Sequence, residues 1–180
     1  MMYPTEEVVL YIMSEMLKNV QSDIAKNIKA KNNETFGAYD AAIMWKAIVG
    51  NRKPWDHKPF IFKTYGRWTI DRQSRTQYNF DIWSNIHYGF VGRSVGFSAW
   101  MLKAGAGYAQ YKAGTSPKGY WERRFKTMGD ADFLAAFDDP KDQAAIDIGI
   151  KLWEKHKLDL TANKILSAIR ARKNELQIKK

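Results

Sequence analysis

The stretch FDIWSNIHYGFVG, residues 80–92, decides the fold because a helix through it has two unlike faces. At about 100° per residue, one narrow sector holds a mostly polar set, which is Asp81, Asn85, Tyr88 and Gly92. The far side holds an apolar set, which is Phe80, Trp83, Phe90 and Val91. We therefore expect a helix that packs into a core through one face and presents polar groups on the other.

The composition limits the class of protein. A chain of 180 residues with 45% hydrophobic content is long enough for one cored domain and short for two. It contains no cysteine, which excludes disulfides and thiolate metal sites. Its 29 Lys and Arg against 19 Asp and Glu favour polyanionic partners, namely nucleic acid, anionic lipid or an anionic cell wall. Charge alone does not choose among the three.

Two further features bear on where the chain acts. No stretch approaches about 18 consecutive apolar residues, so we expect no stable membrane insertion. The first residues, MMYPTEEVV, have neither the basic start nor the apolar run of a signal peptide. We therefore expect that another protein carries this chain to its place of action.

Helical periodicity continues outside the opening stretch. After Thr5, which stands in an N-cap position, apolar residues recur every four positions from Val8 to Ile28 and predict one long amphipathic helix. The other helices predicted from spacing alone cover residues 40–49, 80–94 and 98–112.

Two N-caps mark the helices of the C-terminal part. Asp139 stands directly before Pro140 and predicts the start of a helix through DQAAIDIGIKLW. Thr161 predicts the cap of a last helix, whose inward face is Ile165, Leu166 and Ile169.

Residues 51–78 lack this periodicity. The prolines of NRKPWDHKP predict turns, and weak alternation in KPFIFKTYGRWTIDR predicts a hairpin around Tyr65 and Gly66. The expected fold class is mainly α. It is a single compact helical domain over residues 1–180, with a small irregular or β-hairpin insert near residues 59–78.

Four motifs occur in an order that is specific in combination. They are WDHK at residues 55–58, FDIWSNIHYGFVG at 80–92, GAGYAQ at 105–110 and FDDPKDQAAIDIGI at 137–150. Through them the chain resembles the polymorphic toxin type 44 family, also called bacterial toxin 44. The likeness covers about residues 53–153. Outside it lie an N-terminal helical part, residues 1–50, and a C-terminal helix with a basic tail, residues 158–180.

The resemblance implies a function class and partners. Domains of this family stand at the C-termini of secreted antibacterial effectors, including spike and Rhs-type proteins of type VI secretion. It therefore implies a toxin that a carrier effector or secretion spike delivers into a target bacterial cell. It also implies a cognate immunity protein.

Two carboxylates and a lysine are the catalytic candidates. Asp81 lies on the polar face of residues 80–92, where the alternative is an ion pair with a residue such as Arg93. The family motif, as the resemblance implies, retains Asp81. Asp56 lies on a proline-flanked loop beside Lys58, where the alternative is a solvated turn. We expect catalytic roles for Asp81, Asp56 and Lys58.

Substrate contacts are expected from the other polar and aromatic residues of the motifs, which are Asn85, Tyr88, His57, Gln110, Trp55 and Asp138. The alternative for Gln110 is a satisfied core amide, and Asp139 is assigned to helix capping. Three glycines stand near the polar face: Gly89, Gly92 and Gly96. Because glycine inside a helix costs about 1 kcal/mol against alanine, they indicate either close approach of a substrate or tight packing of another helix.

The histidines do not favour a metal site. Two of the three, His57 and His87, lie inside motifs, which is typical of the paired bases of a metal-independent ribonuclease. On the helical wheel, however, His87 points with Trp83, away from Asp81. Zinc requires three or four ligands, and the sequence does not gather them. We expect no metal and no cofactor, and Mg²⁺ enters only as an option of the nuclease alternative.

Three function classes remain open. A peptidoglycan hydrolase would cleave glycan strands with Asp56 and Asp81, one protonated as acid and one ionised as base or nucleophile. A nuclease would use Asp56, Asp81, His57 and Lys58 on RNA or DNA in the target cytosol. The third class is a non-enzymatic binding or membrane-perturbing module, which the lack of a long apolar hairpin disfavours.

The hydrolase is favoured, with the periplasm as its compartment and the cytoplasm as the alternative. The polar residues of the motifs are chiefly carboxylates and amides, whereas the densest basic cluster, RARKNELQIKK, lies outside them. A nucleic-acid enzyme is expected to concentrate its basic residues beside the site.

Overall fold

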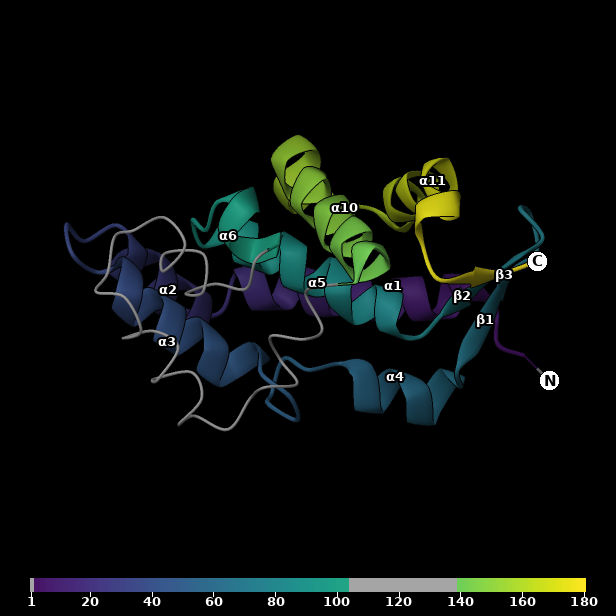
Figure 1. Ribbon diagram of the computed structural model, residues 1–180, viewed down its shortest axis with the longest axis horizontal. Helices are drawn as coiled ribbons and strands as arrows, with labels where there is room; N and C mark the ends of the chain where they lie inside the picture. The colour runs from purple at the N-terminus through teal and green to yellow at the C-terminus, as the bar shows by residue number, and fades with distance from the viewer. Residues whose placement is uncertain (1, 104–138) are drawn as a thin grey trace.

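Helix α5 (Asp81–Ser94) runs through the middle of the protein in the computed structural model, which describes residues 2–103 and 139–180 (Figure 1). Helix α1 (Thr5–Val20) packs along α5, and α10 (Pro140–His156) crosses it. The other helices are α2 (Asp23–Asn32), α3 (Ala38–Val49), α4 (Lys58–Tyr65), α6 (Ala99–Lys103) and α11 (Ala162–Ala171). Two short 3-10 turns cover Lys157–Asp159 and Lys173–Glu175.

Three short strands form an antiparallel sheet at the end of the molecule where both termini lie (Figure 1). They are β1 (Trp68–Asp71), β2 (Thr76–Asn79) and β3 (Ile178–Lys179), in the order β1-β2-β3. Trp68 is opposite Asn79 in the first pair, and Tyr78 is opposite Ile178 in the second. The expected fold class, mainly α with a small β insert, is confirmed.

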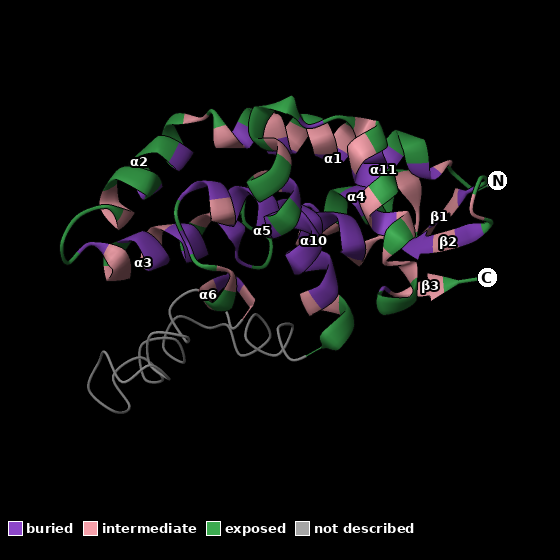
Figure 2. Cartoon of the chain, turned by 90° about the horizontal axis from the view of Figure 1, so that it is seen from above, coloured by how far each residue is buried: buried purple, intermediate pink, exposed green. Residues whose placement is uncertain are grey.

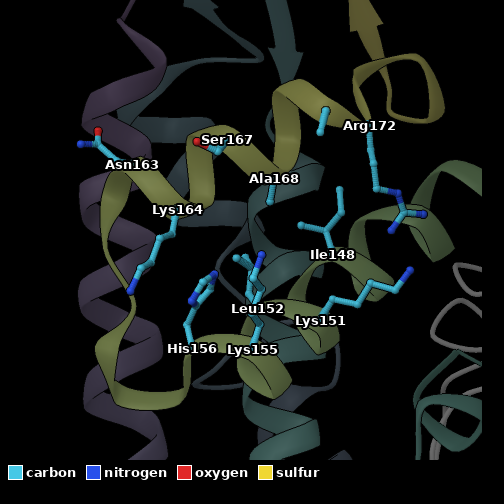
Figure 3. A pocket seen from close by; sticks show the side chains of 11 residues that line it. Ile148, Lys151, Leu152, Lys155, His156, Asn163, Lys164, Ser167, Ala168 and Arg172 are labelled. Carbon is cyan, nitrogen blue, oxygen red and sulfur yellow. The ribbon is translucent and has the colours of Figure 1, made fainter.

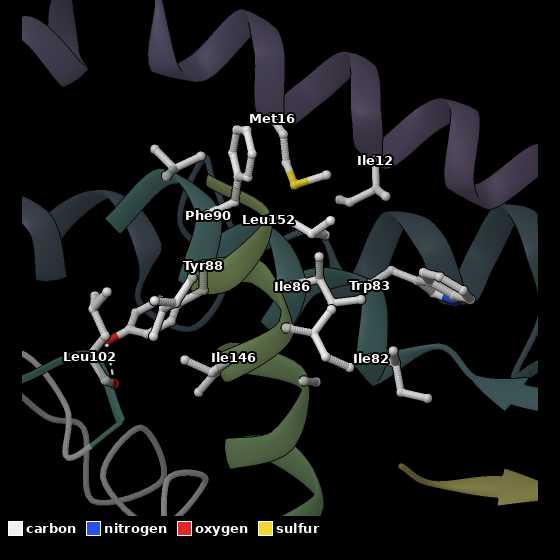
Figure 4. Packing of buried hydrophobic residues seen from close by; sticks show 14 of the residues in the cluster. Ile12, Met16, Ile82, Trp83, Ile86, Tyr88, Phe90, Leu102, Ile146 and Leu152 are labelled. Atoms are coloured by element: carbon white, nitrogen blue, oxygen red, sulfur yellow. Dashed lines mark hydrogen bonds between the residues drawn. The ribbon is translucent and has the colours of Figure 1, made fainter. Parts of the chain in front are cut away.

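Helix α5 is almost entirely enclosed. Every one of its residues is buried except Asp81, Asn85 and Arg93. Apolar side chains of α1 and α10 cover it from two sides, among them Ile12, Met16, Ile146 and Leu152 (Figure 4). Figure 2 shows the consequence, because the buried colour runs through α5 and α10 while exposed residues lie on the outer faces of α1 and α2.

The crossing of α5 and α10 is a contact between backbones. A Cβ atom added to Gly89 would lie 2.1 Å from the carbonyl oxygen of Ile146, and one added to Gly149 would lie 2.1 Å from that of Ile86. No side chain fits at either position, so each helix passes its glycine against the other helix's main chain. Of the two alternatives for Gly89, tight helix packing is therefore the one that the structure shows.

The other two glycines of this stretch also have structural reasons. A Cβ on Gly92 would meet the Leu102 side chain at 2.4 Å. Gly96 has φ of +101° and ends α5, with its N–H donating to Arg93 O and the N–H of Phe97 donating to Gly92 O. That pair of bonds is a Schellman C-cap, which requires a left-handed residue at this position.

The hairpin lies later in the chain than expected. Residues 58–65 form α4, which has Pro59 in its first turn and ends at Gly66 with φ of +81°. The β1–β2 turn follows at residues 72–75. The prediction of a hairpin around Tyr65 and Gly66 was wrong, because the alternating aromatics of KPFIFKTY belong to a short helix that exposes Phe60 and Phe62.

The predicted long N-terminal helix is two helices. Ser22 interrupts it, since its side chain accepts from Ala25 N–H at 3.2 Å and caps α2. Helix α1 begins after Pro4, so Thr5 is its first residue rather than its cap. The cap predicted at Thr161 is confirmed, because its hydroxyl accepts from Lys164 N–H at 3.3 Å.

The basic tail is folded onto the domain by two buried aspartates. Arg170 donates two hydrogen bonds to Asp71, at 2.8 and 2.9 Å, and Arg172 donates to Asp147 at 2.6 Å. Burial alone would raise the pKa of Asp71, but the hydrogen bonds from Arg170 and Ser74 outweigh it and lower that pKa to about 2. The tail therefore stays next to β1 and α10.

In the ranges 2–103 and 139–180, no helix has the length and apolar character needed to span a bilayer.

Gly89→Ala is expected to destabilise the fold. Alanine is the better helix former by about 1 kcal/mol, but its methyl group would push α10 away, and we expect a net loss of about 2 kcal/mol in the free energy of unfolding. Urea denaturation measures this loss. Ser14→Thr adds a methyl group on the exposed face of α1 and should change stability by less than about 0.5 kcal/mol. Equal or higher stability of Gly89→Ala would contradict the backbone contact.

The ion pair between Asp71 and Arg170 predicts that the free energy of unfolding decreases at acid pH. The folded-state pKa of Asp71 falls from 3.8 to about 2, so the stabilisation is complete above pH 3.8 and is lost as the pH falls through about 2. The difference in unfolding free energy between the wild type and Asp71→Asn should shrink by about 2 kcal/mol over that window. Urea titrations at several pH values measure it, and a difference independent of pH would contradict the ion pair.

Candidate active site

Four polar side chains from three helices meet where α5 and α10 begin. Lys58 Nζ of α4 lies 3.6 Å from Asp81 Oδ1 of α5. One turn further along α5, Asn85 donates from Nδ2 to Asp142 Oδ1 of α10 at 2.9 Å. The charges of Lys58 and Asp81 also act on Asp142. We call Lys58, Asp81, Asn85 and Asp142 the carboxylate cluster.

Both carboxylates stand at helix starts. Asp81 is the first residue of α5, and its N–H donates to Asn79 Oδ1 at 3.1 Å. Asp142 is in the first turn of α10, which Asp139 caps by accepting from Lys141 N–H at 2.8 Å, confirming the capping role predicted for Asp139. Unpaired N–H groups at a helix N-terminus favour negative charge, so two such ends provide a suitable place for two carboxylates.

The two carboxylates have different surroundings. Burial raises the pKa of Asp142, and the charges of Asp139 and Asp81 raise it further, against the opposing effects of Lys58 and the Asn85 hydrogen bond. Asp81 pairs instead with the ammonium group of Lys58. The cluster thus combines Asp142, whose surroundings favour the protonated form, with Asp81, which has a cationic partner.

The carboxylate cluster is partly exposed to solvent. The side chains of Lys58 and Asp81 are 32% and 30% exposed, and Asn85 and Asp142 are half-buried. On α4, Phe62 lies one turn after Lys58, on the same helix face, and is exposed. Its ring meets that of Phe80, the residue before Asp81, edge to face at 5.1 Å between centroids. An aromatic surface therefore borders the cluster.

Nothing in the described ranges gathers three or more His, Asp or Glu side chains in a position to hold a metal ion.

Asp56 closes its own loop. Its carboxylate accepts from the backbone N–H groups of Arg52 at 2.8 Å and Lys58 at 3.2 Å. Both oxygens are thus used to fold the turn that leads into α4. The sequence favoured Asp56 as the partner of Asp81, whereas the hydrogen bonds seen here give it a structural task.

Two of the aromatic residues expected at the substrate lie in the hydrophobic core. Trp55 is buried between Trp45 and His87. Tyr88 is buried as well, and its hydroxyl donates to the carbonyl of Leu102 at 3.1 Å. Both side chains are therefore enclosed, whereas that of Phe62 is exposed.

His57 and His87 form a pair beneath the surface. Their ring centroids lie 4.2 Å apart, and they are 4% and 0% exposed. His57 Nδ1 hydrogen-bonds with the Tyr11 hydroxyl at 3.0 Å, and His87 Nε2 with the Asn19 amide at 2.8 Å. Burial lowers the pKa of both rings. The expectation that His87 points away from Asp81 is confirmed, and an acid–base pair of histidines would not reach a polymer from here.

The predicted site residues thus divide into three groups. Lys58, Asp81 and Asn85 come together at the cluster. Asp56, Trp55, His57 and Tyr88 have partners within the fold. Gln110 and Asp138 lie outside the described residues.

Asp142 was missed by the sequence analysis, although a signal was present. It stands four residues before Ile146 and seven before Gly149, so the three share one stripe of α10. Ile146 and Gly149 contact α5 along that stripe. Asp142 lies on the same stripe, in the first turn of α10. A carboxylate at such a position is expected to point toward the neighbouring helix.

Comparison with known proteins gives a family and no individual relative. No curated protein and no solved structure matches this chain. A family description, bacterial toxin 44, matches residues 44–155, which include every member of the carboxylate cluster and the glycine crossing. That range is more than half of the chain and agrees with the likeness expected from the four motifs. The chain belongs to the bacterial toxin 44 family.

Proposed function

We propose that this toxin domain is a peptidoglycan hydrolase that cleaves glycan strands in the periplasm of a target bacterium. The observation that carries the proposal is the unlike pair of carboxylates, Asp81 and Asp142, at the junction of α5 and α10. Glycoside cleavage requires one carboxyl group that gives a proton to the leaving oxygen and one carboxylate that acts as base or nucleophile.

The roles follow from the surroundings of each group. Asp142, whose pKa is raised by burial, is the proton donor. Asp81 is the base or nucleophile, and Lys58 stabilises its negative charge at 3.6 Å. Asn85 holds Asp142 in position by donating to Oδ1, which leaves Oδ2 to carry the proton. The assignment keeps Asp81 from the sequence analysis and replaces Asp56 by Asp142.

The aromatic surface supports a sugar substrate. Phe62 is 52% exposed, and its ring contacts that of Phe80, the residue before Asp81. The exposed part of the ring is available to stack on the apolar face of a pyranose. This surface takes the place of the aromatic cleft expected from Trp55 and Tyr88.

A nuclease is the second candidate, because the net charge is +10 and a lysine stands among the carboxylates. In that function Lys58 would stabilise negative charge on a phosphodiester, and Asp81 and Asp142 would provide acid–base chemistry or oxygen ligands for Mg²⁺. In either function, a carrier effector or secretion spike would deliver the domain, and a cognate immunity protein would protect the producer.

Asp142→Asn and Asp81→Asn are each expected to abolish killing by the domain exported to the periplasm, with little change in the thermal transition. Each substitution removes a titrating group and keeps the side-chain shape, and losing a general acid or base costs about 10²-fold to 10⁴-fold in rate. Toxicity counts and thermal denaturation measure the two effects. Asp23→Asn is the matched control, since this side chain is 95% exposed on α2 and the substitution should keep both toxicity and stability.

Asp56→Asn separates the two assignments of the second carboxylate. It leaves one side-chain oxygen for the two backbone donors, so it should lower stability and keep toxicity in the fraction that folds. Full toxicity of Asp142→Asn, with toxicity lost in a stable Asp56→Asn, would return the role to Asp56.

The compartment of killing distinguishes hydrolase from nuclease. Expression with an added signal peptide should cause rounding and lysis, whereas expression in the cytosol should be tolerated, because peptidoglycan lies outside the inner membrane. Purified domain should release new reducing ends from isolated sacculi. Cytosolic killing with fragmented RNA or DNA and intact sacculi would assign the cluster to the nuclease function.

A further inference from the structure

A second concave site lies between α10 and α11, apart from the carboxylate cluster. It is a cavity of about 480 Å³, a size typical of ligand pockets (Figure 3). Its walls come from the last turns of α10, including Lys155 and His156, and from the outer side of α11, including Lys164. Along α10, the lining residues start at Ile148, six residues and roughly 9 Å beyond Asp142, and reach Lys155, 13 residues and roughly 20 Å beyond it.

The rim of the cavity is cationic. Lys151, Lys155, Lys164 and Arg172 line it, and none of the eleven lining residues is acidic. Lys151 and Arg172 are paired with Asp147, at 2.9 and 2.6 Å. Lys155 has no hydrogen-bond or ion-pair partner within the described part of the chain, and the Lys164 ammonium bonds only to the neutral carbonyl of Asp159. Two lysines that have no carboxylate partner among the described residues thus line the cavity, one from each helix.

His156 lines the same cavity as these two lysines. Its pKa is lowered by burial first and then by the charges of Lys164 and Lys155, against an opposing effect of Asp159. Figure 3 shows Lys155, His156 and Leu152 pointing from α10 toward Ser167 and Ala168 of α11.

The floor of the cavity is apolar. Its aliphatic lining residues are Ile148, Leu152, Ala168 and Ala171. A phosphate chain would form ion pairs with the cationic rim but would leave the apolar floor exposed to water. A ligand with an aliphatic group between acidic groups would form the ion pairs and also cover the floor. Glutamate and aspartate flanking a leucine or isoleucine, on a protein segment, have that combination.

We infer that the cavity between α10 and α11 is a docking site for an acidic, amphipathic segment of a partner protein, with Lys155 and Lys164 as its ion-pair donors and Leu152 and Ala168 in its apolar floor. The segment inserts an aliphatic side chain between the helices and places a carboxylate against each lysine. None of the four residues of the carboxylate cluster lines the cavity, so such a partner binds without occupying the proposed catalytic residues. The inference does not depend on which polymer the toxin cleaves.

Binding of a labelled peptide tests the site. The probe is a fluorescein-labelled helical peptide with leucine on one face and glutamate on the other, and its matched control has glutamine at each glutamate. Anisotropy titrations with the Asp142→Asn chain, chosen to avoid toxicity, should detect the glutamate peptide and not the glutamine peptide. Lys155→Glu combined with Lys164→Glu should weaken binding by about tenfold or more.

The control variant is Lys26→Glu combined with Lys29→Glu on α2, which changes the net charge equally at exposed positions away from α11. It should keep the affinity. Ala168→Phe, which fills the floor, should also weaken binding while the thermal transition stays unchanged. If the two double variants lost peptide affinity equally, the result would overturn the proposed site and indicate non-specific electrostatic attraction. Binding of heparin or duplex RNA that also depends on Lys155 and Lys164 and exceeds that of the peptide would assign the cavity to a polyanion instead.

Discussion

The contact of two main chains at Gly89 and Gly149 is the constraint on which the rest of the structure depends. With no side chain between them, α5 and α10 lie as close as two helices can, and their relative position has little freedom. Asn85 lies one turn before Gly89, and Asp142 two turns before Gly149, on the same contacting stripes. The glycines therefore set the separation at which an amide of one helix meets a carboxyl group of the other. In the proposed function this fixed separation matters, because a catalytic constellation has to be held to within about 0.5 Å.

The second constraint is electrostatic and holds the end of the chain. Asp71 and Asp147 are buried, which is costly for a carboxylate without partners. Arg170 satisfies the first, and Lys103, Lys151 and Arg172 satisfy the second. The partners come from α6, α10 and the segment around α11. These ion pairs therefore fix the positions of the three segments more closely than apolar packing alone would. The same pairs engage Lys151 and Arg172 with Asp147, whereas Lys155 and Lys164 line the cavity with no carboxylate partner among the described residues.

The sequence was sufficient where one local signal dominated. The bipartite face of residues 80–92 predicted α5, and Asp139 with Pro140 predicted the start of α10, because caps and periodicity act within a few residues. It was insufficient for α4, whose aromatics alternate as in a strand while Pro59 and Gly66 delimit a helix. Ser22 likewise ended α1 inside an unbroken apolar period, since its capping bond competes locally with helix continuation.

Three of the four residues of the carboxylate cluster were predicted from the sequence, and Asp142 was not. A helical wheel identifies residues that share a face, such as Asp81 and Asn85, but it does not show what lies opposite. Asp142 comes from a helix about sixty positions later, so its meeting with Asn85 is a property of the tertiary fold. Trp55 and Tyr88 belong to the motifs and lie in the core, so a motif alone does not separate packing from chemistry.

The long separation between Lys58, Asp81 and Asp142 along the chain has a consequence for delivery. A chain threaded through a narrow conduit, or one cut before residue 139, lacks the junction of α5 and α10 and cannot have its two carboxylates side by side. If the proposed function holds, the domain is harmless in transit and becomes active in one step, when the last helices reach α5. The producing cell is then protected during export because the chain order separates the two carboxylates until the domain is folded.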